Sequence, residues 1–226
     1  MALIQSLQNI PATFGELGDL ILTQVIQQAQ KLGCSRLDYV TDRYPAISIK
    51  NTERMRRASD GSQKIQIHSK QQRTPKQWKK FLSSGDNKEA LAEFLYSAWA
   101  EGDFRSVKKP IDVYVTHGSM CHLIRVTAGF SHISVSDELC CDHEEADTRL
   151  LLHARHASDQ LYETIVIKSP DTDVAVMSVG LQSQIGGHLY FATGVKNRTR
   201  IIDVQKIASS LGPAVCDALI GFHVFT

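Results

Sequence analysis

The feature that most constrains the fold is an alternation of helical and strand patterns in the second half of the chain. Residues 142–157 have the apolar spacing of a helix, and residues 164–168 have the aliphatic composition of a buried strand. A second helix is predicted near 174–181 and another strand at 188–191. Such alternation is typical of right-handed crossovers, so we expect an α/β fold of three layers with a mainly parallel sheet.

The first half predicts further elements of both kinds. Apolar residues recur on one helical face over 15–32, with Gly33 as the C-cap, and residues 36–40 predict a short strand that ends before Asp42. Other predicted elements are helices over 76–82 and 87–100, the latter with Asp86 as N-cap, and strands over 111–115 and 121–126. We therefore expect a single domain over residues 1–226, with residues 60–100 as a basic, helical insertion.

Composition excludes several classes of protein. With 226 residues, of which 42% are hydrophobic and 22% charged, the chain can bury a sizeable core. Its apolar stretches are shorter than the ~20 residues that a membrane helix needs, and the N-terminus lacks the pattern of a secretory signal. We therefore expect a nuclear or cytoplasmic protein without a membrane partner. The five cysteines form no paired framework.

Positive charge is concentrated between residues 50 and 80, where Glu53 and Asp60 are the only acids. The basic residues there are Lys50, Arg54, Arg56, Arg57, Lys64, Lys70, Arg73, Lys76, Lys79 and Lys80. Such an excess attracts polyanions, which predicts a nucleic-acid-binding segment, and Tyr44 is a candidate base-stacking platform beside it. The alternative is a solvated basic loop.

Two carboxylates follow the predicted strand 164–168. The order Lys168-Ser169-Pro170-Asp171-Thr172-Asp173 brings both acids just past the carboxyl end of the strand, where open α/β sheets bind ligands. A metal site is one interpretation. The other is that Asp171 only caps the helix that follows.

A second acidic group lies at the start of the predicted helix 142–157. Asp142 and Glu145 have the spacing of a capping box, yet Glu144 and Asp147 add carboxylates that repel one another unless a cation compensates. Glu145 and Asp147 diverge on a regular helix, so they can share a metal only at the irregular helix start.

Carboxylates of this kind suit Mg²⁺ or Mn²⁺, which prefer oxygen ligands, waters and substrate phosphates. Zinc is the alternative, because Cys140-Cys141-Asp142-His143 resembles half of a zinc site, but no second pair completes it. We expect His153 and His156 to lie on the solvent side of their helix.

Taken together, these motifs resemble the PIN-like superfamily, and in particular its flap-endonuclease (XPG-type) branch, which also occurs in transposon-associated proteins. Glu145-Ala146-Asp147, the strand ending in Asp171-Thr172-Asp173, and Val40-Thr41-Asp42-Arg43-Tyr44 carry the resemblance. It implies a hydrolase that cleaves phosphodiester bonds in structured or single-stranded nucleic acid, with DNA favoured over RNA.

The resemblance also assigns roles. The implied metal ligands are Asp42, Glu145, Asp147, Asp171 and Asp173. Lys50 and Arg54 would contact the scissile phosphate, and the basic insertion would match an arch through which substrate threads. The family has a first metal-binding Asp on an N-terminal strand and a last one shortly beyond the position of Thr226, so we expect a domain truncated at both ends.

Two alternatives remain open at this point. One is a nucleic-acid-binding remnant without turnover. The other is an aspartate-nucleophile phosphatase, since Asp171-Thr172-Asp173-Val174 follows an aliphatic strand, although Ser169-Pro170 separates strand and acid.

Overall fold

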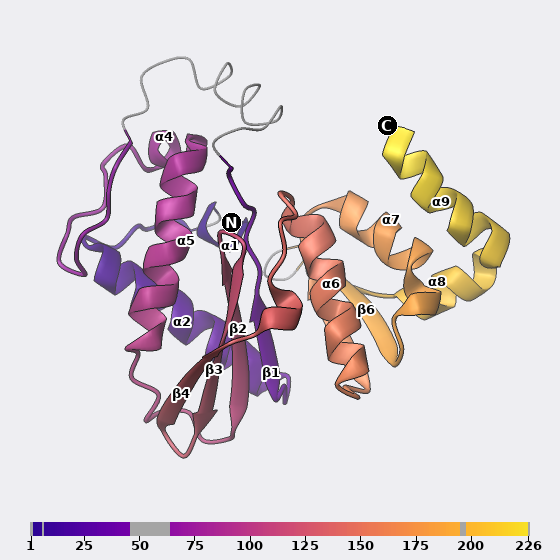
Figure 1. Ribbon diagram of the computed structural model, residues 1–226, viewed down its shortest axis with the longest axis horizontal. Coiled ribbons are helices and arrows are strands. Elements are labelled where there is room, and N and C mark those ends of the chain that lie inside the picture. Colours follow the sequence, from indigo (N-terminus) through magenta and orange to yellow (C-terminus); the bar gives the residue numbers. More distant parts are fainter. Residues whose placement is uncertain (1, 6, 46–63, 195–197, 226) are drawn as a thin grey trace. The chain divides into compact units, whose positions relative to one another are not determined.

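The computed structural model describes residues 2–5, 7–45, 64–194 and 198–225, which form two compact units, Met1–Glu145 and Ala146–Thr226 (Figure 1). Each unit contains helices and strands, so the predicted α/β class is confirmed. The single domain stays a prediction, and each unit is described by itself below.

The first unit is built on a four-stranded sheet in the order β1-β2-β3-β4. Its strands are β1 (Arg36–Tyr39), β2 (Ile111–His117), β3 (Met120–Thr127) and β4 (Phe130–Val135). β1 and β2 are parallel, whereas β2, β3 and β4 form an antiparallel meander. β4 was not predicted, because all six of its residues are exposed and no apolar alternation marks it.

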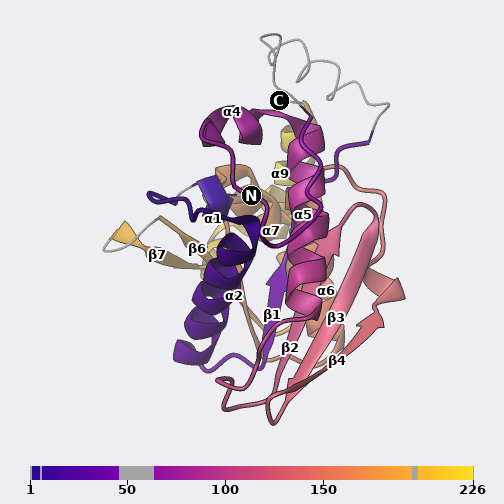
Figure 2. The same cartoon turned by 90° about the vertical axis from the view of Figure 1, so that its left-hand side faces the viewer.

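Helices α2 (Phe14–Lys31) and α5 (Gly85–Ala100) cover one face of this sheet (Figure 2). The unit also contains the short helices α1 (Ala2–Gln5) and α4 (Trp78–Ser83), and a turn of 3-10 helix, η1 (Asp137–Leu139), follows β4. α2 begins with a capping box between Thr13 and Glu16, and Gly33 follows its end at a positive φ of 72°. The N-cap of α5 is Ser84 and not Asp86 as predicted.

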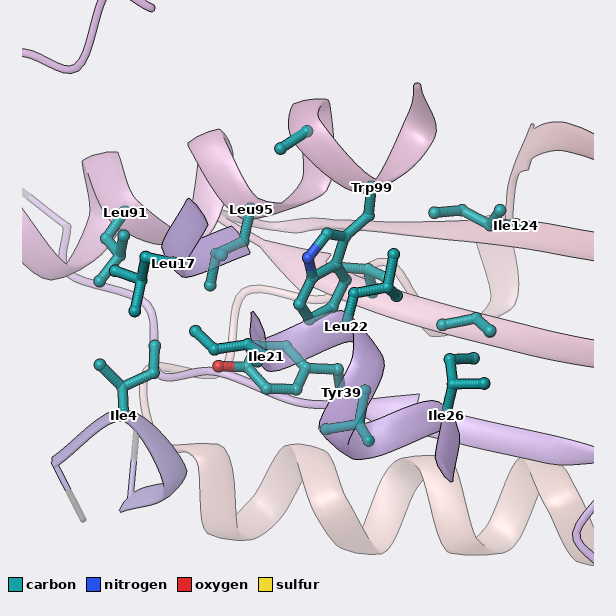
Figure 3. Packing of buried hydrophobic residues seen from close by; sticks show 14 of the residues in the cluster. Ile4, Leu17, Ile21, Leu22, Ile26, Tyr39, Leu91, Leu95, Trp99 and Ile124 are labelled. Atoms are coloured by element: carbon teal, nitrogen blue, oxygen red, sulfur yellow. The ribbon is translucent and has the colours of Figure 1, made fainter. Parts of the chain in front are cut away.

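The core of the first unit lies between α2, α5 and the sheet. Leu17 and Ile21 of α2 meet Leu95 and Trp99 of α5, and all four side chains are buried (Figure 3). Trp99 also donates a hydrogen bond from Nε1 to the carbonyl of Gly18 at 2.9 Å. Thus α5, part of the predicted insertion, is a core element of this unit.

The second unit has a three-stranded sheet in the order β5-β6-β7. Along the chain it contains α6 (Ala146–Asp159), β5 (Thr164–Lys168), α7 (Thr172–Gly180), η2 (Gln182–Gln184), β6 (His188–Thr193), β7 (Arg200–Asp203), α8 (Val204–Leu211) and α9 (Pro213–Phe225). Its core gathers Leu151, Ile165, Ile167, Val174 and Phe191.

The prediction of a mainly parallel sheet is wrong. Each sheet has one parallel pair, β1–β2 or β5–β6, and the remaining described pairs are antiparallel. The cause is local: Gly118 and the Ala128-Gly129 pair, all at positive φ, form two-residue hairpin loops that reverse the chain. A helical crossover is too long to fit at these positions.

Most predicted elements are present, but one boundary differs in a way that matters for the site. β5 has the predicted bounds, whereas α6 begins at Ala146 and not at Asp142. Residues 142–145 therefore lie before the helix. The capping box expected from Asp142 and Glu145 is absent, because Asp142 is not at the start of α6.

Candidate metal and nucleic-acid site

Asp42 is held at the end of β1 by a buried pair of threonines. Thr41 donates from its backbone N to Thr116 Oγ1 at 2.8 Å, and its hydroxyl donates to the Thr116 carbonyl at 2.9 Å. Both threonine residues are fully buried. These bonds continue the pairing of β1 with β2 beyond Tyr39 and fix the chain just before Asp42.

The Asp42 carboxylate itself accepts a hydrogen bond from a neighbour. The Tyr44 hydroxyl donates to Asp42 Oδ2 at 2.8 Å, while the tyrosine ring is buried at 7% exposure. The hypothesis that Tyr44 stacks on a base is therefore wrong, because its ring is covered. Its hydroxyl instead orients the acid.

The segment that carries Asp42 lies beside the segment that leads to Glu145. Arg43 donates from its backbone N to the Glu144 carbonyl at 2.8 Å, and its Nη1 donates to the Asp142 carbonyl at 2.8 Å. Asp42 and Glu145 are both half-buried. The first unit thus brings two acidic motifs, separated by about a hundred residues in the chain, to one place.

The segment of residues 140–145 also forms a hydrogen bond with the β2–β3 hairpin loop. Cys141 donates from its backbone N to the Ser119 carbonyl at 3.0 Å, in the β2–β3 hairpin loop. Residues 140–145 are therefore fixed by tertiary hydrogen bonds, which explains why they do not extend α6.

In the second unit, Asp171 and Asp173 lie at the start of α7. Asp171 is the N-cap: its Oδ1 accepts from the Asp173 backbone N at 3.0 Å, and its own N donates to Ser169 Oγ at 3.1 Å. Asp171 therefore does cap α7, as the sequence suggested. The cap engages one oxygen of an exposed carboxylate, so it leaves the metal hypothesis open.

Asp147 is in the first turn of α6, two residues after Glu145, which precedes the helix. The two acids thus do not lie together on a regular helical turn.

The predicted ligands are divided between the units. Asp42 and Glu145 belong to the first, and Asp147, Asp171 and Asp173 belong to the second. Over the described ranges, no group of three or more His, Cys, Asp or Glu residues gathers in a way that could hold a metal ion. The oxygen donors nevertheless suit Mg²⁺ or Mn²⁺ better than zinc, because each is a carboxylate.

The expectation that His153 and His156 face solvent is wrong, since they are 3% and 9% exposed. Together with the fully buried Arg149 they have i, i+4, i+7 spacing, which gives α6 a polar buried stripe beside the apolar one. Sequence periodicity missed this stripe because polar side chains usually mark an exposed face.

Part of the basic segment can be located. Lys50, Arg54, Arg56 and Arg57 lie outside the described residues. Lys64 forms a salt bridge with Asp86 at 3.2 Å, and Lys70 forms one with Glu101 at 3.0 Å. Arg73, Lys76, Lys79 and Lys80 are exposed. The two ends of α5 thus offset some of the charge that the sequence suggested for this region.

One residue with a clear structural role was missed. Glu89 of α5 accepts from the Tyr44 backbone N at 3.1 Å through Oε2 and from the Gly118 backbone N at 2.6 Å through Oε1. A glutamate in an amphipathic helix gives no sequence signal for such a bridge.

In the first unit, the rings of Tyr96, His117 and His122 stack between α5 and the four-stranded sheet. Tyr96 of α5 lies 4.8 Å from His117 and 3.9 Å from His122 between ring centroids, and the two histidine rings are nearly parallel. Burial, and secondarily the charge of His117, lowers the pKa of His122 below its usual range.

Comparison of the chain with protein-family models, with curated proteins and with solved structures found no match. Within the described residues, every helix is too short or too polar to cross a membrane.

Proposed function

We propose that this chain is part of a PIN-like, flap-endonuclease-type domain that hydrolyses phosphodiester bonds of nucleic acid with Mg²⁺ or Mn²⁺. The observation that supports it best is the pairing of Arg43 with residues 142 and 144. This pairing joins the two acidic motifs of the first unit that the resemblance assigns to one metal centre.

The proposed metal ligands are the ones that the resemblance assigns, namely Asp42 and Glu145 in the first unit and Asp147, Asp171 and Asp173 in the second. The ion, when bound, supplies Lewis-acid stabilisation of phosphate charge and activation of water. Lys50 and Arg54 contribute fixed positive charge at the phosphate that is cleaved. The exposed cations of the basic segment attract the nucleic-acid backbone, and DNA is the favoured substrate.

Nearby groups orient several of these carboxylates. The Tyr44 hydroxyl orients Asp42, and the helix start at α7 orients Asp171 and Asp173. Preorganised carboxylates need less rearrangement when a cation binds, which favours the metal-bound state.

The direct test is cleavage of flap, single-stranded and duplex DNA and RNA by the purified chain with Mg²⁺, Mn²⁺ or EDTA. Asp171→Asn is the informative variant, because asparagine caps a helix as well as aspartate and removes only the charge. We expect metal-dependent cleavage that falls at least about 100-fold in this variant, as several kcal/mol of charge stabilisation are lost.

Asp217→Asn is the matched control, since Asp217 is an exposed acid of the same unit outside the acidic motifs. Its activity should equal that of the wild-type chain. Cleavage that persists in EDTA, or that survives Asp171→Asn, contradicts the proposal.

Binding separates the active nuclease from an inactive remnant. A Lys79→Gln/Lys80→Gln variant should bind single-stranded DNA more weakly, with a salt dependence reduced by about one to two released counterions. Lys108→Gln/Lys109→Gln, which changes two exposed lysines outside the basic segment, is the control. Binding without cleavage would indicate a remnant, and the absence of both would reject a nucleic-acid role.

A further inference from the structure

Tyr44 connects the loop that carries Asp42 to helix α5 through contacts of its backbone, hydroxyl and ring. Its backbone N donates to Glu89, its hydroxyl donates to Asp42, and its ring lies against Gly85, the first residue of α5. A Cβ at Gly85, the first residue of α5, would lie 2.9 Å from Tyr44 Cδ1, so a larger residue has no room there.

Glu89 extends this attachment to a third element. Its second oxygen accepts from the Gly118 backbone N in the β2–β3 loop. A carboxylate that accepts two backbone N–H groups forms charge-assisted bonds, which are stronger than neutral ones. One half-buried side chain therefore links the Asp42 loop, helix α5 and the hairpin loop, which in turn holds the acidic segment through Ser119 and Cys141.

We propose that Glu89 is a positioning residue for the metal site, acting on Asp42 through Tyr44. This inference rests on the proposed function, because it takes Asp42 as a metal ligand. Both Glu89 oxygens accept bonds from backbone N–H groups, so its proposed role is indirect. It fixes the Tyr44 backbone so that the hydroxyl holds one oxygen of Asp42 and presents the carboxylate in a single orientation.

Groups that hold a metal ligand commonly contribute about 10- to 100-fold to metal affinity. Glu89→Gln keeps the size of the side chain but replaces one acceptor with an NH₂ donor, so at least one of the two backbone N–H groups loses its partner. We expect the Mn²⁺ dissociation constant to rise about tenfold in this variant.

The test is Mn²⁺ titration followed by electron paramagnetic resonance, which needs no turnover. Glu93→Gln is the matched control, because Glu93 is exposed on the same helix one turn further on. Its dissociation constant should equal that of the wild-type chain. A Glu89→Gln variant with wild-type affinity would overturn the inference.

A double-mutant cycle separates positioning from a general loss of structure. Tyr44→Phe removes the hydroxyl that contacts Asp42 and keeps the backbone bond to Glu89. If Glu89 acts through Tyr44, adding Glu89→Gln to Tyr44→Phe should change Mn²⁺ affinity little, and full additivity would contradict the mechanism.

Hydrogen exchange of the Gly118 backbone amide reports directly on its bond to Glu89. Exchange at Gly118 should accelerate in Glu89→Gln and stay unchanged in Tyr44→Phe. If Glu89→Gln fails to fold, Tyr44→Phe alone decides, since wild-type Mn²⁺ affinity in that variant rejects the role of the hydroxyl.

The outcomes distinguish the two proposals. A wild-type chain that binds Mn²⁺ and cleaves, with Glu89→Gln equal to it, overturns only the role of Glu89. A wild-type chain that binds no Mn²⁺ overturns both.

Discussion

The acids of the first unit and those of the second are held in different ways. Asp42 and Glu145 are half-buried, and their segments are fixed by hydrogen bonds between residues far apart in sequence. Asp171 and Asp173 are exposed and fixed by the helix that they begin. The first arrangement depends on the whole unit being folded, whereas the second needs only a few consecutive residues.

This difference predicts where substitutions should affect stability. Changes beneath Asp42 should destabilise the first unit, because they leave buried polar groups without partners. Substitutions at Asp171 should lower the free energy of unfolding by no more than the contribution of one helix cap.

The largest effect is expected from Thr116→Val, which has nearly the same shape but cannot bond to Thr41. The buried Thr41 N–H then loses its acceptor, so the free energy of unfolding should fall by about 1–3 kcal/mol in urea titration. A decrease in the free energy of unfolding of less than about 0.5 kcal/mol is typical of ordinary surface substitutions. Such a result would contradict the expected difference between the Asp42 segment and Asp171.

A smaller effect is expected from Asp171→Ala. Loss of the cap to Asp173 should lower the free energy of unfolding by about 1 kcal/mol, and Asp171→Asn should restore it. Urea titration of the three chains measures both. Equal stability of the alanine and wild-type chains would show that the cap contributes nothing.

The smallest effect concerns pH and should be confined to the first unit. Because the folded-state pKa of His122 is below that of the unfolded chain, the unfolded state takes up more protons as the pH falls. Stability is therefore full above the ordinary histidine pKa of about 6.5 and declines as the pH falls through the lowered folded value.

Unfolding at several values between pH 7.5 and 5 should show this decline, and His122→Gln should reduce it. A first unit that grows more stable on acidification over this range would contradict the expected direction of the pH dependence.

The same contrast explains how much could be predicted from the sequence. The bounds of β5 and the cap at Asp171 follow from neighbouring residues, and both were predicted. The start of α6 was misplaced, because the bonds that hold residues 140–145 away from helical geometry come from Ser119 and Arg43. Local pattern contains no information about those partners.

Two other errors have similar causes. The apolar pattern predicted neither the exposed strand β4 nor the two-residue hairpin loops. Without these antiparallel connections, the sheet was expected to be mainly parallel. The bridging role of Glu89 depends on two backbone N–H groups that become neighbours only in the folded unit.

The contact between Arg43 and Asp142 spans 99 residues, and this separation has a consequence for the order of folding. Closing so long a loop is entropically costly, so contacts of this kind form after the local helices and hairpins. The segments that carry Asp42 and Glu145 should therefore come together late on the folding pathway. A nascent or partly folded chain would have the Asp42 segment and the segment of residues 142–145 still apart, so this part of the first unit should form only after translation has passed residue 145.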